Sequence, residues 1–83
     1  MSRYRVRNVS YADEQLCQLP RSSRTAFDAR VEDLKDDPYA IGDPNEDVPG
    51  SYSTTFGEAG IILYMISDKI ATATVLRVNW VDL

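Results

Sequence analysis

Residues 51–81 read SYSTTFGEAGIILYMISDKIATATVLRVNWV, and this stretch decides the fold. It contains segments rich in β-branched and aromatic residues, which are typical of strands, at residues 51–56, 61–67 and 71–81. Gly57 and Gly60 frame the first break, and Asp68 and Lys69 form the second. Breaks this short favour hairpins. We therefore predict three consecutive antiparallel strands.

The region before this stretch predicts one more strand and two helices. Residues 3–9 alternate with period two over most of their length, as in a half-buried strand. Ser10 is then expected to cap a short first helix, whose apolar stripe lies within residues 12–19. Pro20 ends this helix or opens a second one, which we expect at about residues 21–36.

Residues 37–50 are expected to form a loop without regular structure. They contain three prolines and two glycines with acidic residues between them, a composition that interrupts helices and strands. The full order is strand, helix, helix, loop and three strands. It predicts an α+β fold, a four-stranded antiparallel sheet with a two-helix hairpin packed on one face, in a single domain of residues 1–83.

Composition excludes several classes of protein. The 83 residues are 43% hydrophobic and 27% charged, which suits one small globular domain and not a disordered chain. The longest apolar run, residues 59–66, is too short to span a membrane, and the first residues do not resemble a signal peptide. The single cysteine can form no internal disulfide, which favours a cytoplasmic protein. Without histidine, Ser-His-Asp and Cys-His catalysis is excluded.

Positive charge is concentrated in the first predicted strand, although the chain as a whole has a net charge of −4. Residues 1–9 hold Arg3, Arg5 and Arg7 and no acidic residue. If Leu76, Val78 and Trp80 of the last strand face the helices, Arg77 lies on the opposite, exposed face together with these arginines. The four side chains are a candidate patch for RNA or for an acidic partner segment. The alternative is a solvated sheet face that charge protects from edge aggregation.

Two aromatic side chains are further candidates for binding. Tyr64 is a candidate for stacking on a base or supplying a hydroxyl, with Tyr52 a weaker choice, but the apolar neighbours of Tyr64 favour core packing. Trp80 is a candidate anchor for a partner helix, since buried tryptophans dominate interface energetics. Core packing is the alternative for Trp80 as well.

The acidic loop resembles the start of a calcium-binding loop at Asp43, Asn45 and Asp47. The rest of that pattern is missing. The sixth position is Val48, where the turn requires glycine, and the twelfth is Thr54, where a glutamate should complete the coordination. We therefore expect no metal site and no cofactor, and a solvated loop that repels phosphate.

Short motifs along nearly the whole chain occur in the order in which one known family carries them. They are Tyr4-Arg5-Val6, Leu19-Pro20-Arg21, Leu34-Lys35-Asp36-Asp37-Pro38-Tyr39, Phe56-Gly57, Ile62-Leu63-Tyr64 and Val75-Leu76-Arg77-Val78. Together with the order of the predicted elements, these motifs resemble the RelE/ParE superfamily, the toxins of bacterial type II toxin–antitoxin systems.

The resemblance implies a cognate antitoxin as partner, with Trp80 as the candidate anchor for its helix. It also implies a cytoplasmic location and no membrane contact. In the ribonuclease branch of the family, cationic side chains on the second and third strands and near the C-terminus act on messenger RNA in the ribosome. Here residues 52–55, 61–62 and 79–83 contain no lysine or arginine, so most of the expected basic catalytic residues are lacking. We therefore expect a toxin with RNA contacts from the arginines and with unassigned catalytic residues. The alternative is a non-catalytic interaction module that binds an antitoxin-like helix or a topoisomerase.

Overall fold

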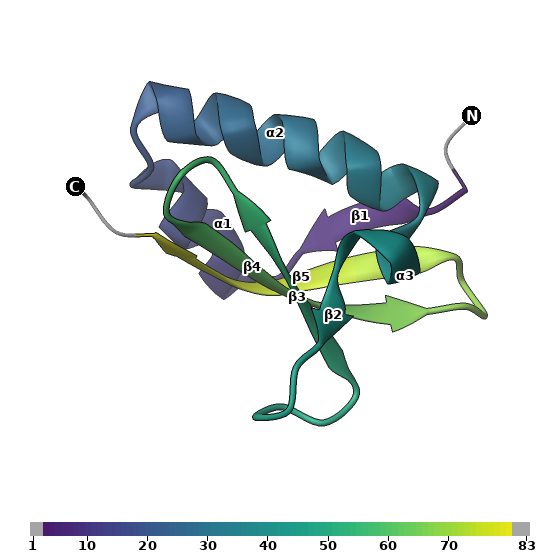
Figure 1. Ribbon diagram of the computed structural model, residues 1–83. Coiled ribbons are helices and arrows are strands. Elements are labelled where there is room, and N and C mark those ends of the chain that lie inside the picture. Colours follow the sequence, from purple (N-terminus) through teal and green to yellow (C-terminus); the bar gives the residue numbers. More distant parts are fainter. Residues whose placement is uncertain (1–2, 81–83) are drawn as a thin grey trace.

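The computed structural model describes residues 3–80 and shows an α+β fold, with helices packed on one side of a five-stranded sheet (Figure 1). The elements in chain order are β1 (Arg5–Asn8), α1 (Ser10–Cys17), α2 (Arg21–Asp36), α3 (Pro38–Ile41), β2 (Asp43–Pro44), β3 (Ser51–Phe56), β4 (Gly60–Ser67) and β5 (Thr72–Trp80). The predicted fold class is confirmed.

The strands follow the order β1-β5-β4-β3-β2 across the sheet. The predicted meander of β3, β4 and β5 is present, with antiparallel pairing throughout. The sheet differs from the prediction in two respects, because it includes a fifth strand, β2, and because β1 pairs with β5 in parallel. Residue alternation identifies a strand but does not encode its direction, which here follows from the helical crossover between β1 and the meander.

The expectation that residues 37–50 lack regular structure was wrong, because this region forms α3 and β2. The Asp37 carboxylate accepts hydrogen bonds from the backbone N–H groups of Tyr39 and Ala40, both at 3.2 Å, and so caps α3. In β2, Asp43 and Pro44 pair with the edge of β3. A side-chain cap and an open sheet edge therefore order a segment whose composition alone indicates a loop.

Helix α1 covers the edge of β5 beyond the end of β1. The Gln15 side-chain oxygen accepts a hydrogen bond from the backbone N–H of Val78 at 2.7 Å, which satisfies a donor that no strand reaches. The helix starts at Ser10 and not after it, since Val9 occupies the capping position and no side chain caps the helix. Asp13, expected in a capping box, instead accepts a hydrogen bond from the Asn8 side chain at 3.1 Å.

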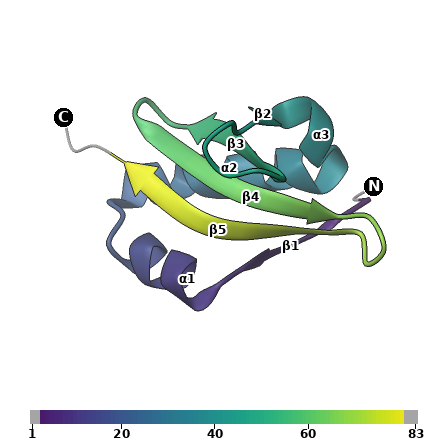
Figure 2. The ribbon, with the colours of Figure 1, turned by 90° about the horizontal axis from the view of Figure 1, so that it is seen from below.

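The core lies between the helices and one face of the sheet. Phe27 and Leu34 of α2 are buried there, and Phe27 meets Phe56 edge to face with ring centroids 5.5 Å apart. In Figure 2, seen from below, β4 and β5 lie in front of α2. The opposite side of the sheet, which faces away from α2, is called the outer face below. No helix within residues 3–80 has the length and apolar character needed to cross a membrane.

Candidate functional site

Three arginines project from the outer face near β1. The parallel pairing places Val6 opposite the buried Ala73, so Arg5 and Arg7 on either side of Val6 point away from the core. Arg77 of β5 is exposed on the same face. None of these three side chains forms an ion pair with another described residue. We call Arg5, Arg7 and Arg77 the arginine edge.

A β-bulge in β5 determines the orientation of Arg77. Val75 and Val78 are both buried although they are three residues apart, because Leu76 is an extra residue in the pairing with β4. Strict alternation from Val75 would turn Arg77 into the core. The bulge therefore brings Arg77 to the face of Arg5 and Arg7, while their role in binding stays a prediction.

Arg3, the fourth candidate arginine, lies outside β1. The predicted strand covered residues 3–9, whereas β1 begins at Arg5. The backbone N–H groups of Arg3 and Tyr4 both donate to the Lys35 carbonyl at 2.9 Å, which attaches this segment to the end of α2. The Arg3 side chain is exposed, but no strand register assigns it to the outer face.

The centre of the outer face is apolar. Ile61 and Met65 of β4 have exposed fractions of 47% and 42%, and Leu63 lies between them with only 7% exposed. We call these three side chains the apolar row. Sequence analysis did not single them out, although the signal was present. The apolar run of residues 59–66 fills both alternate sets of positions, as in a strand that is apolar on both faces.

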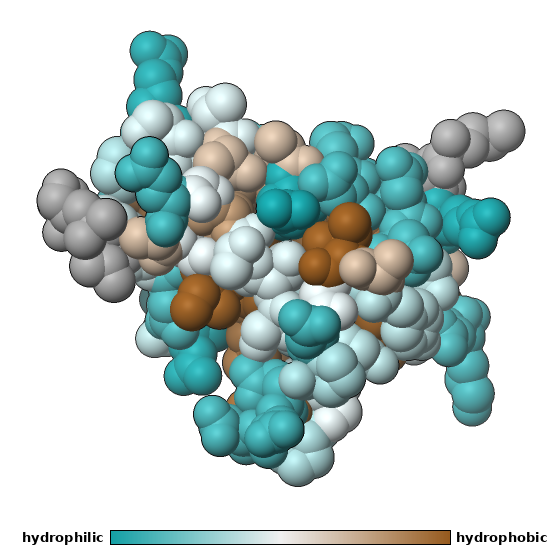
Figure 3. Space-filling model, in the orientation of Figure 1, coloured by the Kyte–Doolittle hydropathy of each residue, from teal (hydrophilic) through white to brown (hydrophobic). Residues whose placement is uncertain are grey.

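The edge of the sheet opposite the arginines is acidic. Asp43 of β2 and Glu46 and Asp47 of the following loop are exposed and line a groove of about 450 Å³ together with Thr55 and Ile61. This loop extends downward from the sheet in Figure 1, and Figure 3 shows it covered with hydrophilic side chains. We call Asp43, Glu46 and Asp47 the acidic edge.

Asn45, the middle residue of the calcium-like pattern, holds the loop between β2 and β3 in place through hydrogen bonds of its side chain. Its side-chain oxygen accepts hydrogen bonds from the backbone N–H groups of Asp47 at 2.9 Å and Val48 at 3.2 Å. Its amide nitrogen donates to the Ser53 hydroxyl at 2.7 Å. Among residues 3–80, no three His, Cys, Asp or Glu side chains are grouped so that they could hold a metal ion.

Tyr64 lies in the core and does not reach the outer face. Its side chain is fully buried, its hydroxyl donates to the Pro38 carbonyl at 2.5 Å, and its ring stacks on Tyr52 with centroids 5.9 Å apart. Burial raises the pKa of Tyr64 to about 12. The structure thus gives Tyr64 the core packing that the sequence favoured, and its hydroxyl is not available to RNA or to a partner.

Two further tyrosines hydrogen-bond the carboxylate of Asp68 in the turn after β4. The Tyr39 hydroxyl donates to its oxygens at 2.7 and 2.8 Å, and the Tyr4 hydroxyl donates at 3.0 Å. The hydrogen bond to Asp68 is the main cause that raises the pKa of Tyr39 to about 12, and it also raises the pKa of Tyr4. This cluster fastens α3 and the segment before β1 to the β4–β5 turn, so we assign it a structural role.

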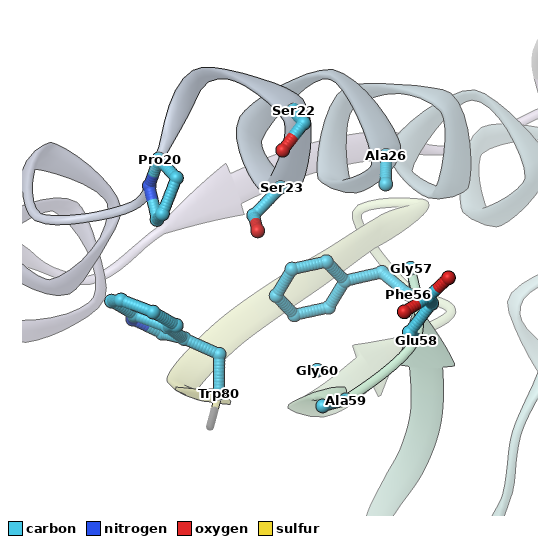
Figure 4. Close-up of a pocket in the computed structure, with 10 residues that line it drawn as sticks. All are labelled: Pro20, Ser22, Ser23, Ala26, Phe56, Gly57, Glu58, Ala59, Gly60 and Trp80. Atoms are coloured by element: carbon cyan, nitrogen blue, oxygen red, sulfur yellow. The ribbon is translucent and has the colours of Figure 1, made fainter. Parts of the chain in front are cut away.

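Trp80 borders a pocket of about 440 Å³ between α2 and the β3–β4 turn. Figure 4 shows the indole next to Pro20 at one end, the Phe56 ring projecting between them and the turn, and Ser23 and Ala26 of α2 on the far side. Trp80 is partly buried and packs against the core cluster while one side borders the pocket. Its role in antitoxin binding remains a prediction.

No protein-family model matches this sequence, and no curated protein matches it. The three-dimensional structure, in contrast, is similar to solved structures of toxin–antitoxin systems. A chain of the RelBE2 toxin–antitoxin complex from Mycobacterium tuberculosis matches with a TM-score of 0.85 and 29% identity, over 94% of this chain and 98% of that chain.

Two more distant structures share the fold. The isolated RelE toxin of Escherichia coli matches with a TM-score of 0.80 and 14% identity, over 96% of this chain and 86% of that chain. A chain of the chromosomal ParDE system from Pseudomonas aeruginosa matches with a TM-score of 0.70 and 15% identity, over 96% of this chain and 98% of that chain.

Proposed function

Since the chain belongs to the RelE/ParE superfamily of toxins from type II toxin–antitoxin systems, we propose that it acts on translation by binding messenger RNA in the ribosome. The arginine edge is the contact surface in this proposal. Its inhibitor is a cognate antitoxin, as in the M. tuberculosis RelBE2 complex that this chain resembles. The observation that carries the proposal is the common orientation of Arg5, Arg7 and Arg77 on the outer face.

Three guanidinium groups on one face suit contacts with phosphate. Arginine presents a planar fork of N–H donors that matches two phosphate oxygens, and phosphate contacts supply most of the affinity of proteins for nucleic acids. The acidic edge on the other side of the sheet repels phosphate, so an RNA strand is directed toward β1. An acidic chain can in this way bind RNA locally.

The proposal covers binding and does not include RNA cleavage by this chain. The chain has no histidine, the hydroxyl of Tyr64 is buried, and the middle of the outer face carries the apolar row in place of cations. Loss of one preorganised charge-stabilising group costs about 10²–10³ in rate, and several such groups are missing together. Binding that blocks the ribosome requires none of them.

The experiment compares two triple variants that remove the same charge. One replaces the arginine edge (Arg5→Ala, Arg7→Ala and Arg77→Ala), and its control removes three exposed cations elsewhere (Arg21→Ala, Arg24→Ala and Lys69→Ala). Expression of the natural chain should arrest growth and the purified chain should inhibit cell-free translation. The arginine-edge variant should inhibit translation at least about tenfold less, and the control should retain inhibition.

Co-expression with the product of the adjacent open reading frame should relieve the arrest. Unimpaired growth at strong expression would refute the proposal, and so would equal inhibition of translation by the two triple variants. Transcripts recovered from the arrested cells should be intact. Circular dichroism of the purified variants distinguishes lost binding from lost folding.

The apolar row favours a second candidate, a non-catalytic interaction module that binds a protein such as a topoisomerase. Ile61 and Met65 expose apolar surface that RNA phosphates do not use but a protein partner buries. If this second candidate is correct, the purified chain inhibits DNA supercoiling in vitro and leaves cell-free translation unaffected. Inhibition of translation without an effect on supercoiling would exclude the second candidate.

A further inference from the structure

Two tyrosines meet on one carboxylate at the end of the molecule where the start of β1, α3 and the β4–β5 turn lie together, on the right in Figure 1. The Tyr39 hydroxyl donates to both oxygens of Asp68 at 2.7 and 2.8 Å, and the Tyr4 hydroxyl donates to Oδ1 at 3.0 Å. The two rings contact each other with centroids 6.5 Å apart. We propose that Tyr4 and Tyr39 form a site of oxidative modification, at which a one-electron oxidant joins the two rings into an intramolecular dityrosine cross-link.

The Asp68 carboxylate accounts for the selection of these two side chains. A phenol is oxidised readily only when its proton leaves together with the electron, so a base in hydrogen-bond contact favours the reaction. Asp68 contacts both hydroxyls, and it forms no ion pair with another residue of the described range 3–80. The buried Tyr64 hydroxyl, in contrast, donates to a backbone carbonyl oxygen, which is a far weaker base than a carboxylate. The proton is therefore released at Tyr4 and Tyr39 and not in the core.

A chain of aromatic contacts leads from the core to this pair. Tyr64 stacks on Tyr52 with centroids 5.9 Å apart, and Tyr52 meets Tyr39 edge to face at 5.7 Å. Aromatic rings in contact exchange electrons rapidly, so an electron removed from Tyr52 or Tyr64 is replaced from Tyr39. The radical then stays at Tyr39, where the proton is accepted. Tyr11 of α1 takes part in none of the ring contacts found among residues 3–80.

The cross-link consumes two equivalents of oxidant, such as carbonate radical anion or a photo-oxidised ruthenium complex. Each phenol loses one electron to the oxidant and one proton to the Asp68 carboxylate, which passes each proton on to water. The two phenoxyl radicals join through a carbon–carbon bond between the ring positions next to the hydroxyls. Each joined carbon then loses its proton while each oxygen regains one, so the pair has lost two electrons and two protons in all.

The hydrogen bonds also bring the reacting ring positions together. Both hydroxyl oxygens contact the same oxygen atom of Asp68, so the carbons next to these hydroxyls lie near each other. The ring planes meet at 78°, an angle that a single bond between two rings accommodates. Tyr39 is 43% exposed on the short helix α3, so its ring is free to make the small movement that bond formation requires.

The modification changes the stability of the fold. A bond between Tyr4 and Tyr39 closes residues 4–39 into a covalent loop and attaches the segment before β1 to α3. Closing a long loop restricts the unfolded chain more than the folded one. The cross-linked chain should therefore unfold at a higher urea concentration than the unmodified chain. Oxidation converts the protein into a form that resists unfolding.

The test exposes dilute folded protein to a ruthenium tris-bipyridine complex, persulfate and light. Every chain carries Cys17→Ser, since the exposed thiol reacts with the same oxidant. The parent chain should acquire dityrosine fluorescence while it stays monomeric on a denaturing gel. Mass spectrometry of its peptides should find Tyr4 linked to Tyr39 with the loss of two hydrogen atoms, and the purified product should have the higher urea midpoint.

Variants identify the residues that the reaction uses. Tyr4→Phe and Tyr39→Phe should each abolish the intramolecular cross-link, whereas the control Tyr11→Phe, at an exposed tyrosine of α1, should leave its yield unchanged. Asp68→Asn should slow the reaction at least about tenfold, because an amide does not accept the proton, and Asp68→Glu should restore part of the rate. In concentrated urea the preference for this pair of tyrosines should disappear.

Three results would overturn the proposal. They are the absence of dityrosine from the oxidised folded chain, a cross-link that involves Tyr11 as often as Tyr4 or Tyr39, and an unchanged rate in an Asp68→Asn variant that circular dichroism shows to be folded. These measurements use no RNA, ribosome or antitoxin, so their outcome is independent of the proposed function.

Discussion

Replacing Gly42 with alanine should strongly destabilise the protein, although the backbone at Gly42 is ordinary. Gly42 joins α3 to β2 with φ at −118°, an extended conformation that any residue adopts. An added Cβ atom would overlap the Tyr64 hydroxyl and lie only 2.8 Å from the Ser53 carbonyl oxygen. Ser53 is held in the sheet, so the Tyr64 side chain must move and lose its hydrogen bond to Pro38.

The magnitude of this effect follows from two contributions. Leaving a buried polar group without its partner costs about 1–3 kcal/mol. Forcing extra atoms into a filled core costs about 1–3 kcal/mol as well. Because the two partly overlap, we expect the Gly42→Ala substitution to lower the free energy of unfolding by about 2–4 kcal/mol. That is most of the stability of a domain of this size.

Urea denaturation followed by far-ultraviolet circular dichroism measures this loss. The Tyr64→Phe variant removes the hydroxyl that the new methyl group would overlap, so the double variant should lose less stability than the sum of the two single variants. A Gly42→Ala variant that stays within about 0.5 kcal/mol of the natural chain would contradict the expected overlap with Tyr64, and so would two losses that simply add.

Three further predictions concern the stability of the fold. Ala71 has a φ of 46°, in the left-handed region that favours glycine. Ala71→Gly should stabilise the protein by about 0.5–1 kcal/mol, because it relieves about 1–2 kcal/mol of backbone strain in the folded chain, which exceeds the entropy that glycine adds to the unfolded chain. A lower urea midpoint would contradict this. Gln15→Ala should cost about 1–2 kcal/mol, because an amide of β5 loses its acceptor, while Gln18→Ala at the exposed end of α1 should be neutral. The raised pKa values of about 12 keep Tyr39 and Tyr64 protonated in the folded chain where the unfolded chain ionises near 10. The two tyrosines therefore leave the urea midpoint unchanged just below pH 10, and the midpoint should fall as the pH rises from 10 to 12. A flat midpoint across that range would speak against both pKa values.

Local signals predicted the elements whose stability depends on their own residues. The second helix occupies residues 21–36 as expected, with Pro20 before its first turn and an apolar stripe that includes the buried Phe27 and Leu34. Within the described residues, the strands of the meander also start and end within one residue of the prediction. Val81, the predicted last residue of the third strand, lies outside the described residues. In each of these elements, the periodic apolar residues and the residues that end the element lie in the same short segment of sequence, so the segment alone predicts the element.

The elements that sequence reasoning missed depend on distant partners. β2 has only Asp43 and Pro44, and no propensity identifies a strand of this length without the edge of β3 beside it. α3 depends on the cap from Asp37 and on Tyr64, whose hydroxyl bonds the carbonyl of Pro38. A proline-rich, acidic composition correctly indicates a weak local preference, and tertiary contacts then decide the outcome.

The candidate site has one feature with a local sequence signal, the bulge in β5, and one that depends on distant parts of the chain, the pair of charged edges. Apolar residues occupy the odd positions 73 and 75 and then the even positions 76, 78 and 80, so the sequence itself contains a change of phase at this point. That change predicts a bulge near Leu76, and the bulge turns Arg77 to the outer face. The opposite charges at the two edges are not readable in this way. The arginine edge and the acidic edge are remote in sequence, and only the strand order places them on either side of β4. Which surface a charged segment contributes to depends on the position of its strand in the sheet, and no local sequence pattern encodes that position.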